Sequence, residues 1–355
     1  MTAELLVELV KRYSPSCHEA PAVTFLVEWM REQGFDAWID SAGNACGQRG
    51  PQDAPHTIML LGHIDTVAGE IPVRIDDGVL YGRGSVDAKG PLSTFAEAAA
   101  RAQLPAGWRV LVVGAVEEEA PTSKGAHYIR DRYTPDMCII GEPSGADRIT
   151  LGYKGHLMMD YTLSRPVAHS SRPDPTVAEL GIAFWNRVQM WVTQQNQHAK
   201  RQFDAIVPHL LAMHTHSDGF WDTVDMTLSF RLPPAKTIQE VRDAVFALIE
   251  PDARVRPYSA VEAYRGEKNN ALVRGMLAAI RAQGQQPGFV VKGGTSDMNV
   301  VGPVWSCPIV AYGPGDSALD HTPTERLPLC EYTKAVNTLQ HVLEHLEENI
   351  RGNGR

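Results

Sequence analysis

The sequence predicts an α/β protein with a mostly parallel central sheet, interrupted by a smaller ferredoxin-like α+β domain. Short apolar strands alternate with helices up to about residue 151 and again from about residue 267, an order that builds a parallel sheet. Between these parts the order becomes strand, helix, strand, strand, helix, strand. We therefore expect one domain from residues 1–151 and 260–355, and an inserted domain from residues 152–259.

The first domain begins with an amphipathic helix at the N-terminus. Ser14-Pro15-Ser16 and the downstream Glu19 then indicate the start of a second helix, which ends at Gly34. The helices expected next begin near Lys89 and near residue 122. The strands expected in this part lie at about 36–40, 57–62, 109–116 and 137–141.

The inserted domain begins with a strand around Tyr161. Its remaining elements are expected as a helix at 173–196, strands at 206–214 and 223–232, a helix at 237–249 and a strand at 253–259. The first domain then resumes with a helix at 268–283, strands near 289–291 and 308–312, and a final helix at 328–350.

Composition limits the class of protein. The chain has 355 residues, 43% of them hydrophobic and 21% charged, which is ordinary for a soluble globular protein. A net charge of −9 without a basic run argues against nucleic acid, and no apolar stretch is long enough to span a membrane. The N-terminal apolar residues include two acids, unlike a signal peptide. Five scattered cysteines without a CxxC pair favour reduced thiols in a cytoplasmic protein.

Histidines and acids follow the predicted strands in a pattern that indicates a two-metal hydrolytic centre. His63 and Asp65 end one apolar run, Asp87 lies in a later glycine-rich loop, and Glu142 follows another strand. Sites of parallel sheets form beyond the carboxyl ends of the strands. Two ions about 3.5–4 Å apart need a shared carboxylate and terminal ligands. A carboxylate can bridge two ions, so Asp87 is the preferred bridge; its alternative role is to cap the following helix.

Three successive glutamates, Glu117, Glu118 and Glu119, follow the apolar strand at 109–116. Adjacent residues at a strand end point in different directions, so one can bind a metal while its neighbour acts as the base. We expect Glu117 to be the base, Glu118 to be a ligand and Glu119 to face solvent. The alternative interpretation is a solvated acidic patch.

These motifs resemble those of the co-catalytic zinc aminoacylase and carboxypeptidase family, which includes acetylornithine deacetylase and succinyl-diaminopimelate desuccinylase. The resemblance covers nearly the whole chain and rests on GHIDTV, GRGSVDAKG, the three glutamates, GEPS and the late His321. It implies a di-zinc exopeptidase-like catalytic domain with two divalent ions, Zn²⁺ or Co²⁺. The implied ligands are His63 and Glu142 for one ion, Glu118 and His321 for the second, and Asp87 between them. Asp65 would support the site, Glu117 would be the general base, and the Asp87–Ala88 peptide would be cis.

The same resemblance implies that the inserted domain is a lid and dimerisation surface. His169 would donate to the oxyanion, with His156 as a nearby competitor. Arg231 would bind the substrate α-carboxylate, and the family usually has an asparagine where this chain has Asp218. The residues expected to line the substrate pocket are Gly294, Thr295 and Ser296.

Shorter stretches, among them Glu142-Pro-Ser-Gly and His169-Ser-Ser-Arg-Pro, look like the hydrolases of the amino-group-carrier lysine and arginine pathways. These release lysine or ornithine from the terminal glutamate γ-carboxyl of a small acidic carrier protein. That partner predicts a basic lid surface, with candidates Lys154, Arg165, Arg172, Arg187, Lys200 and Arg201. A deacylase of free substrates or a peptidase stays open as an alternative, as does a catalytically silent metal-binding scaffold.

Overall fold

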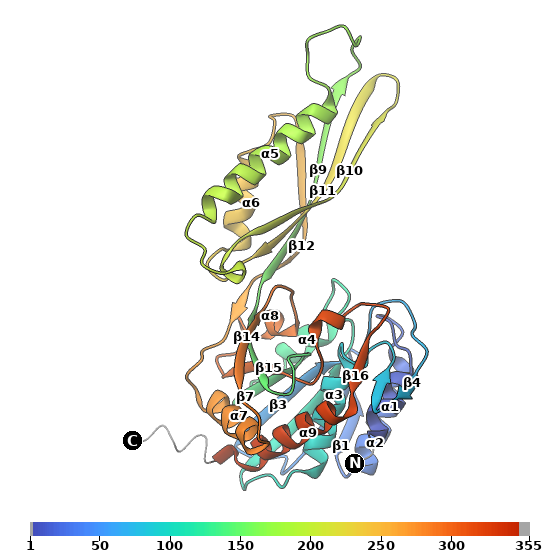
Figure 1. Ribbon diagram of the computed structural model, residues 1–355, viewed down its shortest axis with the longest axis vertical. Helices are drawn as coiled ribbons and strands as arrows, with labels where there is room; N and C mark the ends of the chain where they lie inside the picture. Colours follow the sequence, from blue (N-terminus) through green and yellow to red (C-terminus); the bar gives the residue numbers. More distant parts are fainter. Residues whose placement is uncertain (1–2, 348–355) are drawn as a thin grey trace. The chain divides into compact units, whose positions relative to one another are not determined.

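The computed structural model describes residues 3–347 and divides the chain into two compact units (Figure 1). The first unit contains the chain up to Gly152, Gly266–Val291 and the chain from Ser296 onward. The second contains Tyr153–Arg265 and Lys292–Thr295. The predicted boundary at residue 259 falls inside a strand of the second unit, because β12 (Arg254–Val261) pairs along its length with β9 (Gly155–Pro166).

The first unit is built around a nine-stranded sheet whose centre is parallel. Strands β6, β3, β7 and β15 lie side by side in that order and run in the same direction. Antiparallel strands flank this centre on both sides. The strands are β1 (Asp36–Ile39), β2 (Ala45–Arg49), β3 (His56–His63), β6 (Trp108–Ala115), β7 (Met137–Gly141), β8 (Arg148–Tyr153), β14 (Gly288–Lys292) and β15 (Ile309–Tyr312), together with β13 (Tyr264–Arg265), whose residues belong to the second unit. Strands β2 and β8 were not expected from the sequence.

Helices cover this sheet, and their apolar faces form the core of the unit. They are α1 (Glu4–Lys11), α2 (Ala20–Glu32), α3 (Lys89–Arg101), α4 (Lys124–Arg130), α7 (Ala271–Ala282), α8 (Asp297–Val301) and α9 (Leu329–Glu344). Helix α3 packs against both α1 and α9, and its residues from Lys89 to Ala99 are all buried. A single apolar cluster therefore links the N-terminal helix to the C-terminal one. None of the described helices combines the length and apolar character needed to cross a bilayer.

A second, three-stranded sheet in this unit joins distant segments. It has the order β16 (Arg326–Pro328), β5 (Val79–Tyr81) and β4 (Arg74–Asp76), all antiparallel. This small sheet was not predicted. It places the segment after His321 beside the segment that leads to Asp87.

The second unit has the predicted ferredoxin-like order. Its sheet has the order β10 (Val207–Ser217), β11 (Trp221–Leu232), β9 and β12, and its helices are α5 (Val177–Gln195) and α6 (Ile238–Phe246). Alternate residues of β9 are buried in a separate apolar cluster. Helix α5 begins later than the predicted residue 173, because Thr176 and Glu179 form a capping box that fixes its start.

Candidate metal centre

Three neighbouring parallel strands deliver side chains to one edge of the central sheet. His63 is the last residue of β3, the three glutamates follow β6, and Glu142 follows β7. The register pairs His63 with Ala115, and Gly62 with Gly141. The strand ends therefore lie level with one another, which brings residues from distant parts of the sequence into one site.

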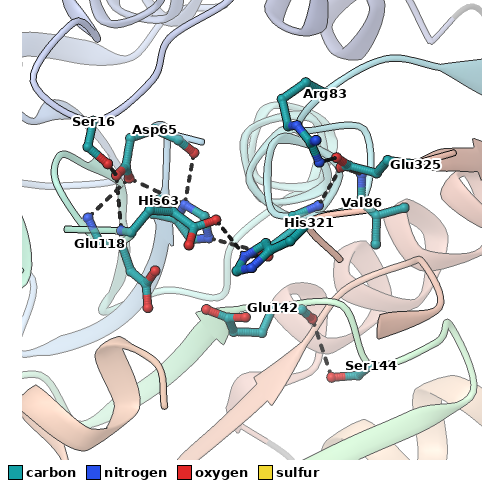
Figure 2. A network of polar contacts seen from close by, with 12 residues as sticks. Ser16, His63, Asp65, Arg83, Val86, Glu118, Glu142, Ser144, His321 and Glu325 are labelled. Atoms are coloured by element: carbon teal, nitrogen blue, oxygen red, sulfur yellow. Dashed lines mark hydrogen bonds and ion pairs between the residues drawn. The ribbon is translucent and has the colours of Figure 1, made fainter. Parts of the chain in front are cut away.

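Asp87 contacts both His63 and His321, whose side chains are shown in Figure 2. Its Oδ1 lies 3.1 Å from Nε2 of His63, and its Oδ2 lies 3.0 Å from Nε2 of His321. Each carboxylate oxygen thus faces a different imidazole, which is the arrangement that a bridging carboxylate requires. The Asp87–Ala88 peptide is cis, as the resemblance implied.

Two groups of residues could each hold a cation, and they share Asp87. One group is His63, Asp87 and Glu142; the other is Asp87, Glu119 and His321. Within each group the candidate ligand atoms all lie within 4.8 Å of one another. The structure thus brings His63, Asp87, Glu142 and His321 together in the expected grouping. The glutamate of the second group, however, is not the expected one.

The three-glutamate segment needs a correction of one residue. Glu119 does not face solvent: its side chain is 9% exposed, and its Oε1 lies 3.1 Å from Nε2 of His321. Glu117, the expected base, instead accepts a hydrogen bond of 2.6 Å from the Thr122 hydroxyl and lies 3.6 Å from Lys124 Nζ. Glu118, the expected ligand, belongs to neither cation group in the described part of the chain.

The backbone explains this shift. Glu117 has a φ of 60°, a left-handed conformation that side-chain alternation along a strand does not predict. The chain therefore turns immediately after the strand, and its next two N–H groups point at Asp65. Glu118 donates to Oδ1 of Asp65 at 3.1 Å, and Glu119 donates to Oδ2 at 3.0 Å.

Asp65 is fully buried and organises both sides of the site. Besides the two glutamate N–H groups, it accepts a hydrogen bond of 2.7 Å from the Ser16 hydroxyl. Nδ1 of His63 lies 3.1 Å from the Asp65 carbonyl oxygen and 3.4 Å from its Oδ1. Such contacts fix the orientation of a ligand imidazole. Sequence reasoning missed Ser16 and also Glu19, whose Oε1 accepts the N–H of Glu117 at 3.2 Å.

The electrostatics of the site favour bound cations. Burial raises the pKa of Glu118 and of Glu142 well above the usual range, and neighbouring carboxylates raise both further. Burial also raises the pKa of Asp297 to about 7, and neither of its buried carboxylate oxygens has a hydrogen-bond partner. Burial lowers the pKa of His63, but hydrogen bonds to Asp65 and Asp87 outweigh this effect and raise it overall. Buried carboxylates without enough positive partners are costly, so this set of oxygen and imidazole donors fits divalent ions.

The expected substrate residues lie in or beside the second unit. His169 is exposed, with Nδ1 2.9 Å from the Ser171 hydroxyl. Arg231 is the second-last residue of β11 and lies opposite His156, and one of its terminal guanidinium nitrogens is buried without a partner. Burial lowers the pKa of His156 to about 4, and Arg231 contributes to this shift. A neutral His156 is therefore a weaker competitor for the oxyanion role.

Ser296 and Asp218 were also considered for the substrate site, and both make hydrogen bonds that stabilise local backbone structure. Gly294 and Thr295 are at least partly exposed, but the Ser296 hydroxyl is buried and caps α8 by accepting the N–H of Met298. That hydroxyl is thus engaged in a helix cap that the sequence analysis did not predict. Asp218 holds the turn between β10 and β11, accepting the N–H groups of Phe220 and Trp221 at 2.8 Å each.

Of the six candidates for the predicted basic lid surface, five are paired with acids or buried, and the sixth, Lys200, is exposed. Four of the arginines pair with nearby acids: Arg165 with Asp252, Arg172 with Asp174, Arg187 with Glu250, and Arg201 with Asp204. Lys154 is buried, and its ammonium donates to the Ala205 carbonyl oxygen. Sequence counting alone does not show such local pairing.

Comparison with known proteins identifies the family to which this chain belongs. The profile of peptidase family M20/M25/M40 matches residues 59–345. The chain belongs to this family. It is 44% identical over 354 residues to a protein of Deinococcus radiodurans named [LysW]-lysine hydrolase, covering 97% of this chain and 96% of that protein. It is 40% identical over 348 residues to a putative [LysW]-lysine/[LysW]-ornithine hydrolase of Thermococcus kodakarensis, covering 97% and 92% respectively.

Solved structures confirm the fold. The aminopeptidase PepT of Bacillus cereus superposes with a TM-score of 0.79 at 18% identity, covering 98% of this chain and 99% of that one. An M20 family metallo-carboxypeptidase of Sulfolobus solfataricus superposes with a TM-score of 0.74, also at 18% identity, covering 98% and 99%. The family membership confirms the predicted resemblance and the predicted class of enzyme, a hydrolase.

Proposed function

We propose that this protein is a metal-dependent amide hydrolase that releases lysine or ornithine from an amino-group carrier protein. The bond cut joins the γ-carboxyl of the carrier's terminal glutamate to the α-amino group of the amino acid. One observation carries the hydrolytic assignment: Asp87 is shared by two cation-binding groups, and the half-buried Glu118 has a pKa raised well above its usual range. The substrate class is supported by two relatives at 40% identity or more that are named for carrier-linked lysine or ornithine.

The proposed ligands of the two ions are the members of the two cation-binding groups. His63 and Glu142 would hold one ion, Glu119 and His321 would hold the second, and Asp87 would contribute one oxygen to each. Zn²⁺ and Co²⁺ both suit imidazole and carboxylate ligands. When bound, two such ions would polarise the amide carbonyl and lower the pKa of a water molecule towards about 7.

The remaining residues would move protons and hold the substrate. Glu118 takes the role first expected of Glu117: it accepts a proton from the attacking water and returns it to the leaving α-amino group. Its raised pKa suits a carboxyl that must both accept and donate. Asp65 holds the backbone that positions Glu118. His169 would donate to the developing oxyanion, and Arg231 would pair with the α-carboxylate of the released amino acid.

A homodimer formed through the second unit is part of the proposal. Strand β10 is an edge of its sheet, so its outer N–H and C=O groups can pair with another strand. Large apolar side chains are exposed on α5 and β10, namely Ile182, Met190 and Leu211. We also propose a cytoplasmic location, which the five free cysteines support.

The deciding experiment compares three substrates with the Zn²⁺- or Co²⁺-loaded enzyme. They are carrier-linked lysine, carrier-linked ornithine and free acetylornithine, and the measurement is released amino acid. We expect release from the carrier conjugates only. Lysine and ornithine differ by one methylene, which is worth about 1–3 kcal/mol in a pocket, so both should react at different rates. Efficient cleavage of acetylornithine alone would refute the carrier assignment while leaving the hydrolytic one intact.

A further inference from the structure

Glu325 connects the two chain segments that carry Asp87 and His321 (Figure 2). It lies four residues after His321 and is completely buried. Its Oε1 accepts the N–H of Val86 at 2.9 Å and that of Asp87 at 3.1 Å. Its Oε2 accepts a hydrogen bond of 2.8 Å from Arg83. One carboxylate therefore binds three donors of the loop that presents the shared ligand.

Arg83 completes this connection. It is buried, and its Nε donates to the Gly69 carbonyl oxygen at 2.9 Å. The guanidinium is thus fixed on both sides, which holds the Glu325 carboxylate in one position. A bidentate or doubly anchored guanidinium is a more rigid partner than a lysine ammonium.

The loop between Gly82 and Asp87 depends on these contacts for its shape. Gly84 has a φ of 86°, and a Cβ there would lie 2.9 Å from Thr66, so the loop follows a path that only glycine permits. Just before the loop, β5 pairs with β16, which starts at the residue after Glu325. The small sheet sets where the two segments meet, and Glu325 sets the orientation of the residue that the loop delivers.

We propose that Glu325, held by Arg83, is a positioning residue of the metal centre. It orients Asp87 so that one carboxylate oxygen faces His63 and the other faces His321. This inference rests on the metal centre proposed above and not on the identity of the substrate. Within residues 3–347, Glu325 makes no hydrogen bond to His63, Glu119 or Glu142, so it would affect bound ions through Asp87.

Glutamine cannot replace this carboxylate. Three N–H groups point at Glu325, whereas an amide offers only one acceptor oxygen and presents an NH₂ donor in place of the other. In Glu325→Gln the amide NH₂ faces either Arg83 or the N–H groups of Val86 and Asp87, so one of these contacts is lost. The loop that orients Asp87 is then held less firmly. Arg83→Lys is a milder change, because it keeps the positive charge beside Glu325 but removes the rigid bond to Gly69.

The test measures metal binding rather than turnover. Metal-free wild type, Glu325→Gln and Arg83→Lys are titrated with Zn²⁺ against a chromophoric chelator, and the absorption spectrum of each Co²⁺-loaded protein is recorded. We expect two ions in the wild type. Glu325→Gln should bind at least one ion about 10- to 100-fold more weakly, the usual effect of losing a group that orients a ligand. Arg83→Lys should weaken the same ion to a smaller extent and alter the Co²⁺ spectrum.

Glu97→Gln is the matched control. Glu97 is also a buried carboxylate, paired with Arg101 and accepting the Tyr332 hydroxyl at 2.8 Å, but none of these partners is a proposed ligand. It should lower the unfolding temperature and leave both Zn²⁺ affinities unchanged. Wild-type affinities in Glu325→Gln would overturn the inference. If that variant does not fold, wild-type affinities and an unchanged spectrum in Arg83→Lys would overturn it instead. Failure of the wild type to bind two ions would refute the metal centre itself.

Discussion

Oδ2 of Asp87 lies 3.0 Å from Nε2 of His321, although 234 residues separate them in the sequence (321 − 87). Hydrogen bonds to Asp87 and, to a smaller extent, to Glu119 raise the pKa of the exposed His321 imidazole to about 10. Because a ligand histidine must be neutral, ion binding has to displace this proton. The two side chains are therefore already close enough to bind the same cation.

The roles of Glu117 and Glu118 can be separated by a matched pair of substitutions. Glu118→Gln should lower kcat by about 10²- to 10⁴-fold, the usual contribution of a general base, because glutamine cannot accept the proton of water. Glu117→Gln should retain most of its turnover, since Glu117 contacts Thr122 and Lys124 and not the ligands. Steady-state hydrolysis of carrier-linked lysine measures both.

Metal content provides the control for this pair. Neither glutamate belongs to a cation-binding group, so both variants should contain two ions per chain by elemental analysis. Loss of turnover in Glu117→Gln with full activity in Glu118→Gln would restore the original assignment from the sequence and contradict the one-residue correction.

Glu119→Gln should remove the second ion selectively. Among residues 3–347, that group consists of Glu119, His321 and the shared Asp87, and an amide is a weaker ligand than a carboxylate. We expect one tightly bound Zn²⁺ per chain in this variant and two in the wild type, measured by elemental analysis after dialysis against a weak chelator. Two tightly bound ions in Glu119→Gln would exclude it as a ligand.

Sequence patterns predicted the fold and most of the site for a physical reason. Apolar strands followed by polar residues identify the carboxyl ends of parallel strands, and these ends must meet at one edge of the sheet. His63 and Glu142 follow directly from this rule. Asp87 was chosen because it lies in a glycine-rich loop and a carboxylate can bridge two ions. The pairing of His321 with a particular ion came from the family resemblance, because no periodicity determines the path of its loop.

The failures have an equally physical origin. The assignment within the three glutamates depended on the left-handed backbone at Glu117, which is set by contacts with Asp65 and Glu19 from other segments. The sequence analysis did not identify Glu325, because its role depends on a three-stranded sheet too short to recognise. The basic lid surface stays a prediction, and sequence counting could not show that several of its arginines pair with acids.

The proposed dimer can be tested on the exposed apolar side chains of the second unit. Met190 on α5 is 66% exposed and Leu211 on β10 is 58% exposed. Burying such side chains between two copies would stabilise a dimer. The double variant Met190→Glu with Leu211→Lys should therefore be a monomer. Light scattering coupled to size-exclusion chromatography measures its mass. Val304→Lys changes a side chain that is 57% exposed on the first unit, and it should leave the mass unchanged. A monomeric wild type would contradict the dimer.

Asp297 should affect stability in opposite directions with and without metal. Burial raises its pKa to about 7 from 3.8, so the folded protein binds this proton more tightly than the unfolded chain does. Without metal, the stability associated with Asp297 is therefore complete below about pH 3.8 and is lost as the pH rises towards 7. At pH 8 the charged carboxylate opposes folding of the metal-free protein, whereas bound cations would be attracted to it.

We therefore expect Asp297→Asn to raise the unfolding temperature of the chelator-treated protein at pH 8 and to have less effect at pH 5. In excess Zn²⁺ the variant should gain less stability than the wild type. Bound Zn²⁺ stabilises the folded protein in proportion to the logarithm of the Zn²⁺ affinity, and the neutral amide lowers that affinity. Calorimetry under the four conditions measures these differences. An equal shift with and without Zn²⁺ would mean that Asp297 does not interact with the ions, and that its unpartnered oxygens have another cause.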